Sequence, residues 1–211
     1  MPELVFPDHF PRPQRNAVAY QALYARIRGV DDSYFGEQPW QERRIPPGLT
    51  AAQVYRRLPV APDFEYGGYL TRSRIRFRKC WADRASIIAS KPCTFHTHPT
   101  EHPNANLPSD RDVYSFLRYR NLRSVTVGNS LLWVFDKTPA TLRTVERLND
   151  WEEQHMIDTL RGGCSLEEYP SIILRALGLR WPKSRRSRSD NWPEVLDGAL
   201  QIRVTVLERT E

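Results

Sequence analysis

One short stretch, Phe95-His96-Thr97-His98-Pro99, constrains the fold and chemistry of this chain more than any other. Residues 93–98 have the composition of a β-strand, and a proline closes it. Side chains alternate between the two faces of an extended strand. We therefore expect His96 and His98 to point to the same face.

A second pair of polar residues follows the histidines. The loop 99–108, rich in proline and asparagine, leads to an expected helix over 109–119. Ser109 and Asp112 stand three residues apart at its start, so they share one face of the first turn. Two imidazoles and one carboxylate form the ligand set of a catalytic zinc site, in which water holds the fourth position.

Hydrolysis at such a site also needs a general base outside the metal's coordination shell. Glu65 is the best candidate, because it lies in an apolar, glycine-flanked segment where burial would raise the pKa of its carboxyl group. Ser109 could donate a hydrogen bond to the oxyanion of a tetrahedral intermediate.

Each of these parts also has a simpler structural explanation. Two histidines at this spacing are often surface or packed residues, Ser109 and Asp112 also match a helix capping box, and Glu65 could be an ordinary strand-edge carboxylate. The combination favours the metal site, since three of the five histidines fall within seven residues. We expect the third of these, His102, to be exposed, with a substrate contact or incidental metal binding as alternatives. His9 and His155 are expected at the surface.

The rest of the chain reads as a mixture of helices and strands. We expect a loop over 30–48, a short apolar run at 86–89, a hairpin turn at 128–130 and a basic linker over 181–190. Expected helices cover 14–28, 51–58 with Thr50 as its cap, 142–160 and 172–179, and expected strands cover 73–81, 124–127, 131–135 and 201–209, the last at a sheet edge.

Length and composition restrict the class of protein. The 211 residues suit one domain with extensions, and no apolar run is long enough to cross a membrane. The start of the chain lacks the pattern of a signal peptide, and three scattered cysteines do not make a disulfide framework. We therefore expect a cytoplasmic protein without a membrane partner, with export by a dedicated secretion machine as the alternative. Its oligomeric state cannot be read from the sequence.

These residues together resemble the signature of the JAMM, or MPN-plus, zinc metalloproteases, and a prokaryotic member in particular. Phe95-His96-Thr97-His98-Pro99 followed by Pro108-Ser109-x-x-Asp112 is similar to the metal-binding part of that signature, and Glu65-Tyr66-Gly67-Gly68-Tyr69-Leu70 resembles the segment bearing the catalytic glutamate. The resemblance covers roughly residues 50–140.

The resemblance implies an α/β fold, with a curved mixed β-sheet sandwiched by helices in an arrangement similar to that of cytidine deaminases. It implies that His96, His98 and Asp112 bind zinc, that Glu65 is the general base, and that Ser109 stabilises the oxyanion. It also implies cleavage of an amide or isopeptide bond beside the C-terminal tail of ubiquitin or a ubiquitin-like protein.

The resemblance also suggests how the chain is divided. We expect an N-terminal extension over 1–49 with one helix, a JAMM-like catalytic core over 50–140, and a C-terminal part over 141–211 with helices, the basic linker and an edge strand. Only 30 residues separate Glu65 from His96, which leaves little room for a substrate-gripping insertion. The basic strand 72–79 is a candidate edge for pairing with an extended tail, although a solvated face is the more ordinary explanation.

Three other functions compete with this hypothesis. A cysteine hydrolase using Cys93 and His96 is disfavoured, because residues three apart on a strand point to opposite faces. A nucleic-acid-binding or scaffold protein is the alternative, supported by the basic run at 183–188 and a pI near 9.4. A catalytically inactive member of the same fold is disfavoured, since every expected ligand and the glutamate are present.

Overall fold

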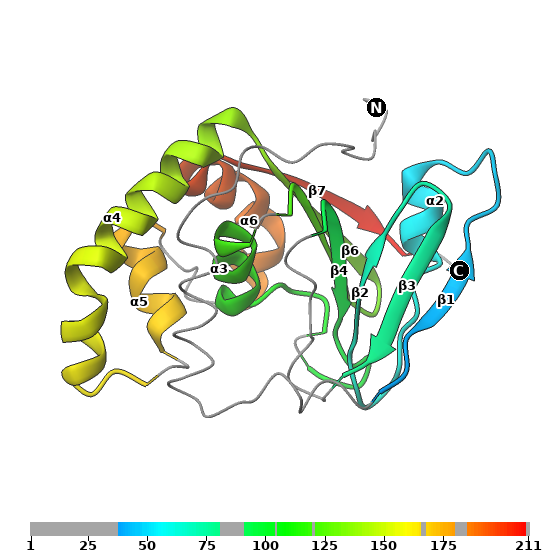
Figure 1. The fold of residues 1–211 in the computed structure, drawn as a ribbon, viewed down its shortest axis with the longest axis horizontal. Helices are drawn as coiled ribbons and strands as arrows, with labels where there is room; N and C mark the ends of the chain where they lie inside the picture. The colour runs from blue at the N-terminus through cyan, green and yellow to red at the C-terminus, as the bar shows by residue number, and fades with distance from the viewer. Residues whose placement is uncertain are drawn as a thin grey trace. The chain divides into compact units, whose positions relative to one another are not determined.

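The structure is a computed structural model, which describes residues 38–80, 91–103, 105–119, 121–165, 168–179 and 185–209. The expected helix over 14–28, the apolar run at 86–89 and His9 lie outside these residues. Figure 1 shows the elements in chain order: β1 (Gln41–Arg44), α2 (Ala51–Arg56), β2 (Tyr66–Leu70), β3 (Arg74–Lys79), β4 (Cys93–Thr97), α3 (Asp110–Arg118), β5 (Arg123–Val127), β6 (Leu131–Lys137), α4 (Pro139–Arg161), α5 (Tyr169–Ala176), α6 (Arg185–Leu200) and β7 (Ile202–Glu208).

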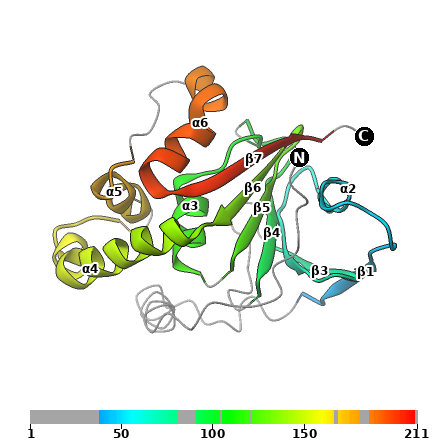
Figure 2. The same cartoon turned by 90° about the horizontal axis from the view of Figure 1, so that it is seen from above.

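The strands form one seven-stranded mixed sheet in the order β1-β3-β2-β4-β5-β6-β7. Strand β4 runs parallel to β5 and antiparallel to β2, and β3 is antiparallel to both of its neighbours. Figure 2 shows β4 to β7 side by side in this order. The expected α/β class is therefore confirmed, as is the expected edge strand near the C-terminus.

One sequence expectation about the strands is wrong, and one alternative is excluded. The expected loop over 30–48 contains β1. Its four residues are all polar and exposed, so no apolar alternation marks the strand in the sequence. Strand β1 pairs with β3, which also pairs with β2, so the basic strand 72–79 is an interior strand and not a sheet edge. Both corrections come from the pairing of β1 with β3, two strands that lie far apart in the sequence.

The expected basic linker over 181–190 is also partly wrong. Helix α6 begins at Arg185, within that range, while residues 181–184 lie outside the described part of the chain. Trp192, Leu196 and Leu200 are fully buried further along the same helix. Burial of these apolar side chains stabilises the helix more than its polar first half predicts.

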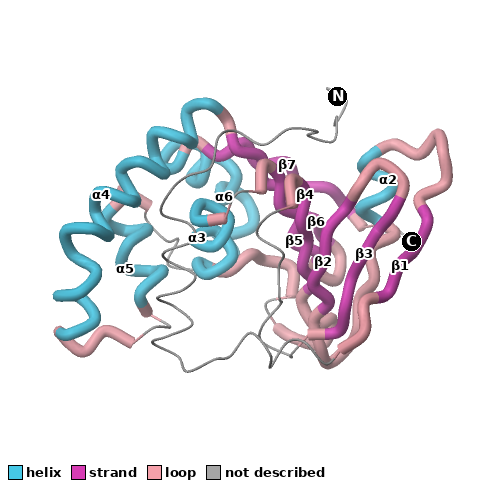
Figure 3. Tube along the Cα trace, viewed as in Figure 1, coloured by secondary structure: helices cyan, strands magenta, loops and turns pink. Residues whose placement is uncertain are grey.

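By their internal contacts, the residues form two compact units. The first comprises the described residues of 1–106, 119–134 and 206–211, and the second comprises the described residues of 107–118 and 135–205. In the first unit, α2 packs its buried side chains into a core built by the strands; Figure 3 shows this helix next to β1 and β3. Thr50 caps α2 as expected, since Gln53 N donates to Thr50 Oγ1 at 3.3 Å and Thr50 N donates to Gln53 Oε1 at 2.8 Å.

The second unit contains most of the helical residues. Helices α3, α4 and α5 pack against one another. A buried ion pair joins Arg118 on α3 to Glu152 on α4 at 2.8 Å, and the hydroxyl groups of Tyr114 and Tyr169 donate to the same carboxylate. Burial raises the pKa of the Glu152 carboxyl, and the neighbouring Arg118 opposes that rise. Among the described residues, no helix has the length and apolar composition needed to cross a membrane.

Strand register assigns the side chains of the first unit to two different faces of the sheet. One face carries Phe77, Phe95 and Val125 and belongs to the hydrophobic core. The opposite face is polar, because the alternate positions of the same strands are charged, hydroxylated or glycine. Its members across β3, β2, β4 and β5 are Arg76, Arg78, Gly67, Tyr69, Thr94, His96, Ser124 and Thr126.

Candidate metal centre

The two histidines come from the end of β4 and point to the polar face, as the sequence predicted. His96 is 4% exposed, and His98 is half-buried just beyond the strand. Their ring centroids are 5.2 Å apart. Cys93 is buried in the hydrophobic core on the other face, so the alternative of a Cys93–His96 pair has no geometric support.

The strand opposite the histidines provides space at this position. Gly67 on β2 pairs directly with His96, so no side chain from β2 stands beside that imidazole. On the other side, β5 places Thr126 level with His96. The Thr126 hydroxyl is buried and has no hydrogen-bond partner among the described residues. Space beside an imidazole and an unsatisfied buried oxygen are compatible with a polar ligand at this place.

A loop carbonyl orients His98. Nδ1 of His98 lies 3.3 Å from the carbonyl oxygen of Ala105, an arrangement in which the ring nitrogen donates and the carbonyl accepts. This hydrogen bond places the proton on Nδ1, so Nε2 is the nitrogen that could bind a metal ion. Metal-binding histidines commonly use their second nitrogen in this way.

The hairpin joining β5 and β6 holds this loop in place. Asn106 Oδ1 accepts a hydrogen bond from Ser130 N at 2.7 Å, and Trp133 Nε1 donates to the Asn106 carbonyl at 2.7 Å. A Cβ atom on Gly128 would lie 2.4 Å from the Ala105 oxygen, so only glycine permits this close approach. The glycine-asparagine turn at 128–129 is the only sequence signal of these supporting residues.

Ser109 and Asp112 form a reciprocal cap at the start of α3. Ser109 N donates to Asp112 Oδ2 at 2.7 Å, and Asp112 N donates to Ser109 Oγ at 3.2 Å. The capping role weighed from the sequence is therefore present. It uses only one carboxylate oxygen of Asp112, and Ser109 accepts rather than donates. The cap is thus compatible with metal binding through Asp112 Oδ1 and with a hydrogen bond donated by the serine hydroxyl.

The three expected ligands form a group that could hold a metal ion. One ligand atom from each of His96, His98 and Asp112 lies within 4.8 Å of the other two. Because each residue offers one atom, the group has three ligands, as in metal sites that keep a position open. The site fits a divalent ion such as zinc without identifying the ion.

Glu65 lies immediately before β2 and is 7% exposed. Extending the register of β2 and β4 by two residues brings it level with His98, on the same polar face. Within the described residues, the group of three side chains that could hold a metal ion does not include Glu65. Glu65 is therefore outside the candidate ligand set and on the face that carries the histidines.

The remaining histidines of the described part lie apart from this group. His102 is exposed in the loop after β4, and His155 is exposed on α4, where it stacks on Trp151. Both were expected to be solvent-exposed, and both expectations are confirmed. Their exposure makes them useful controls for the two buried or half-buried histidines.

The fold and this group define a class: a mixed α/β protein with a seven-stranded sheet and a candidate His-His-Asp metal site at the end of one strand. Searches of known protein families, curated proteins and solved structures find no match to this chain.

Proposed function

We propose that this protein is a zinc-dependent hydrolase of amide or isopeptide bonds, with the JAMM-like signature as its catalytic core. The observation that carries the proposal is the group of His96, His98 and Asp112. Two neutral imidazoles and one carboxylate are the donors of many catalytic zinc sites, which keep one coordination position open for substrate or water. Zinc is preferred over magnesium because imidazole ligands suit zinc, whereas magnesium prefers oxygen ligands alone.

Residues around the ligands support a hydrolytic role. A bound zinc ion supplies a Lewis acid and acidifies a water molecule. In the proposed reaction, the Glu65 carboxylate takes the proton from the attacking water and returns it to the leaving amine. The Ser109 hydroxyl donates to the developing oxyanion. Ala105 keeps the His98 ring in the orientation that presents Nε2.

The proposed substrate is the C-terminal tail of a ubiquitin-like protein, which is the class that the resemblance implies. An extended tail could reach the site by pairing with a strand. The two strands at the edges of the sheet are β1 and β7. Of these, β1 is connected through β3 and β2 to β4, the strand that carries His96.

The first test is zinc content by elemental analysis after purification and dialysis against zinc. We expect nearly one zinc per wild-type chain, loss of zinc in His98→Ala, and retention in the exposed-loop control His102→Ala. Asp112→Asn keeps an oxygen to accept from Ser109 N but removes the anionic ligand, so it should lose zinc while α3 stays capped. Circular dichroism checks that each variant is folded.

The second test is cleavage of ubiquitin-like conjugates by the zinc-loaded protein. Glu65→Gln should retain zinc and lose about a hundredfold or more in kcat, because it removes only the general base. A wild-type chain that binds no zinc at neutral pH would refute the proposal. Equal activity of wild type and Glu65→Gln would refute the assignment of the base.

A further inference from the structure

A second group of residues, outside the candidate metal site, lies on the polar face of the sheet in the first unit. It comprises Arg74 and Arg76 of β3, Lys91, Trp40 and Tyr69, and we call it the cationic strip. Trp40, Arg76 and Lys91 are half-buried, Arg74 is exposed, and Tyr69 is buried. The strip therefore combines accessible positive charge with buried or half-buried aromatic rings.

Aromatic rings hold the cations of the strip in place. The Arg76 guanidinium lies 5.8 Å from the ring centroids of both Trp40 and Tyr69, and its NH1 group donates to the Tyr69 hydroxyl at 3.0 Å. The Lys91 ammonium lies 4.9 Å from the Tyr69 centroid. Cation–π contacts and the phenol hydrogen bond restrict these long side chains, so a ligand that binds them loses less conformational entropy.

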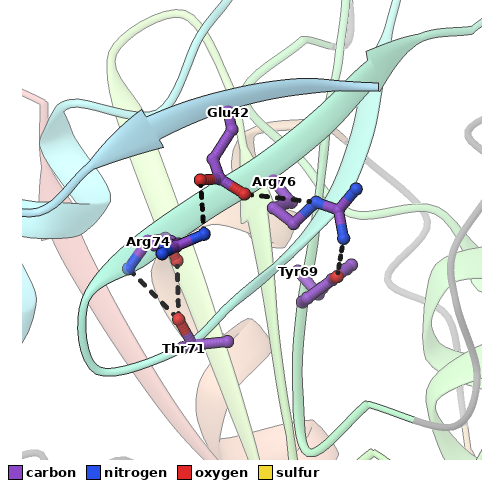
Figure 4. Close-up of polar contacts among 5 residues, drawn as sticks. All are labelled: Glu42, Tyr69, Thr71, Arg74 and Arg76. Carbon is purple, nitrogen blue, oxygen red and sulfur yellow. Dashed lines mark hydrogen bonds and ion pairs between the residues drawn. The ribbon is translucent and has the colours of Figure 1, made fainter. Parts of the chain in front are cut away.

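A carboxylate of the chain itself forms ion pairs with two arginines of the strip. Glu42 on β1 lies 2.8 Å from Arg74 NH1 and 3.5 Å from Arg76 Nε, so its two oxygens bridge both arginines (Figure 4). The side chains of Arg74 and Glu42 are 59% and 40% exposed. Exposed ion pairs of this kind contribute little free energy, and an external carboxylate can replace the internal one.

The strip is continuous with the strand that carries the histidines. Across the polar face, Arg76 pairs with Tyr69, which pairs with Thr94, two residues before His96 on β4. Arg76 is thus two strand spacings from β4, or about 10 Å. A few residues of an extended polypeptide span that distance.

We propose that the cationic strip binds an acidic polypeptide segment, so that the substrate carries aspartate or glutamate a few residues from the bond that is cleaved. The assignment of a substrate class rests on the proposed hydrolytic function, whereas the binding itself does not. Carboxylates are the complement of the strip in charge and in geometry, as the position of Glu42 demonstrates.

Single-stranded nucleic acid fits these residues less well. Its bases need uncovered aromatic faces on which to stack. In the strip, Trp40 has the guanidinium groups of Arg76 and Arg78 over its ring, and Tyr69 has Arg76 and Lys91. The rings therefore support the cations and do not form an open platform for bases.

Fluorescence anisotropy of the full chain with a labelled oligo-glutamate peptide tests the binding. Oligo-glutamine of equal length and a single-stranded oligothymidylate serve as comparison probes. We expect Arg74→Gln or Arg76→Gln to weaken peptide binding about two- to fivefold each, the range for exposed ion pairs. Glu42→Gln should strengthen it by a similar factor, because it removes the internal competitor. Arg203→Gln, an exposed change on β7, is the matched control and should have no effect.

The outcomes separate this proposal from the hydrolase proposal. Peptide binding that persists in His98→Ala supports the strip even if the chain holds no zinc. If the wild type binds zinc and cleaves, acidic residues near the cleaved bond should lower KM, and Arg76→Gln should remove that preference with kcat unchanged. No preference for oligo-glutamate over oligo-glutamine, tighter binding of the oligothymidylate, or an equal loss in Arg203→Gln would overturn the proposal.

Discussion

Replacing Gly128 with alanine should weaken metal binding without touching a ligand. The added Cβ would lie 2.4 Å from the Ala105 carbonyl oxygen and 2.8 Å from Asn106 Cα, where non-bonded atoms need about 3.5 Å. Both clashing atoms belong to the backbone, so the loop must move by about 1 Å. The hydrogen bond from His98 Nδ1 to Ala105 is 3.3 Å long, near the limit of such bonds, and will not survive that shift.

Loss of a hydrogen bond that orients a metal-binding histidine typically costs ten- to a hundredfold in metal affinity, or about 1.4–2.7 kcal/mol. Competition with a chromophoric zinc chelator at neutral pH measures the change. Asn106→Ala, which releases the same loop without adding an atom, should change affinity in the same direction. Gly198→Ala is the control, since its Cβ would meet nothing within 4 Å. A folded Gly128→Ala variant with wild-type zinc affinity would refute the role given to Ala105.

Three further changes test the fold. Burial, aided by Arg118, lowers the pKa of Lys137 to about 7, below its ordinary value of 10.5. Keeping Lys137 charged therefore lowers the free energy of unfolding, and this cost is full below about pH 7 and disappears above pH 10.5. In urea unfolding, Lys137→Met should raise the free energy of unfolding by about 2 kcal/mol at acidic pH, with a smaller gain at about pH 9. An equal gain at both pH values would contradict this. Gly68→Ala should lower the free energy of unfolding by about 3 kcal/mol, because its Cβ would lie 2.2 Å from the Arg76 carbonyl oxygen; an unchanged urea midpoint would exclude the clash. Thr50→Ala removes the cap of α2 and should cost about 1 kcal/mol in the same assay, and no loss would mean that α2 does not depend on its cap.

Features fixed by neighbours in sequence could be predicted. Thr50 and Gln53 cap α2, and Ser109 and Asp112 cap α3, because each pair lies within one helical turn. The shared face of His96 and His98 follows from the alternation of an extended strand. The turn at 128–130 closes with a hydrogen bond from Gly128 N to the Leu131 carbonyl at 2.8 Å, as expected of a short hairpin.

Features that depend on distant partners could not be predicted. Strand β1 has only exposed side chains, so its place in the sheet comes from backbone pairing with β3 and not from an apolar pattern. The same pairing makes the basic strand, which the sequence offered only as a candidate edge, an interior strand. The buried Arg118–Glu152 pair joins residues that read as surface charges on two separate helices.

The sequence by itself indicated the candidate metal site, because the residue types and short spacings of two histidines and an aspartate are local properties. Only the tertiary structure decided what surrounds these residues. Strand register put Gly67 beside His96 and a row of arginines on the same face. The hairpin brought the Ala105 carbonyl to His98. Such contacts follow from pairing between strands far apart in the chain, and no local pattern records which strands pair.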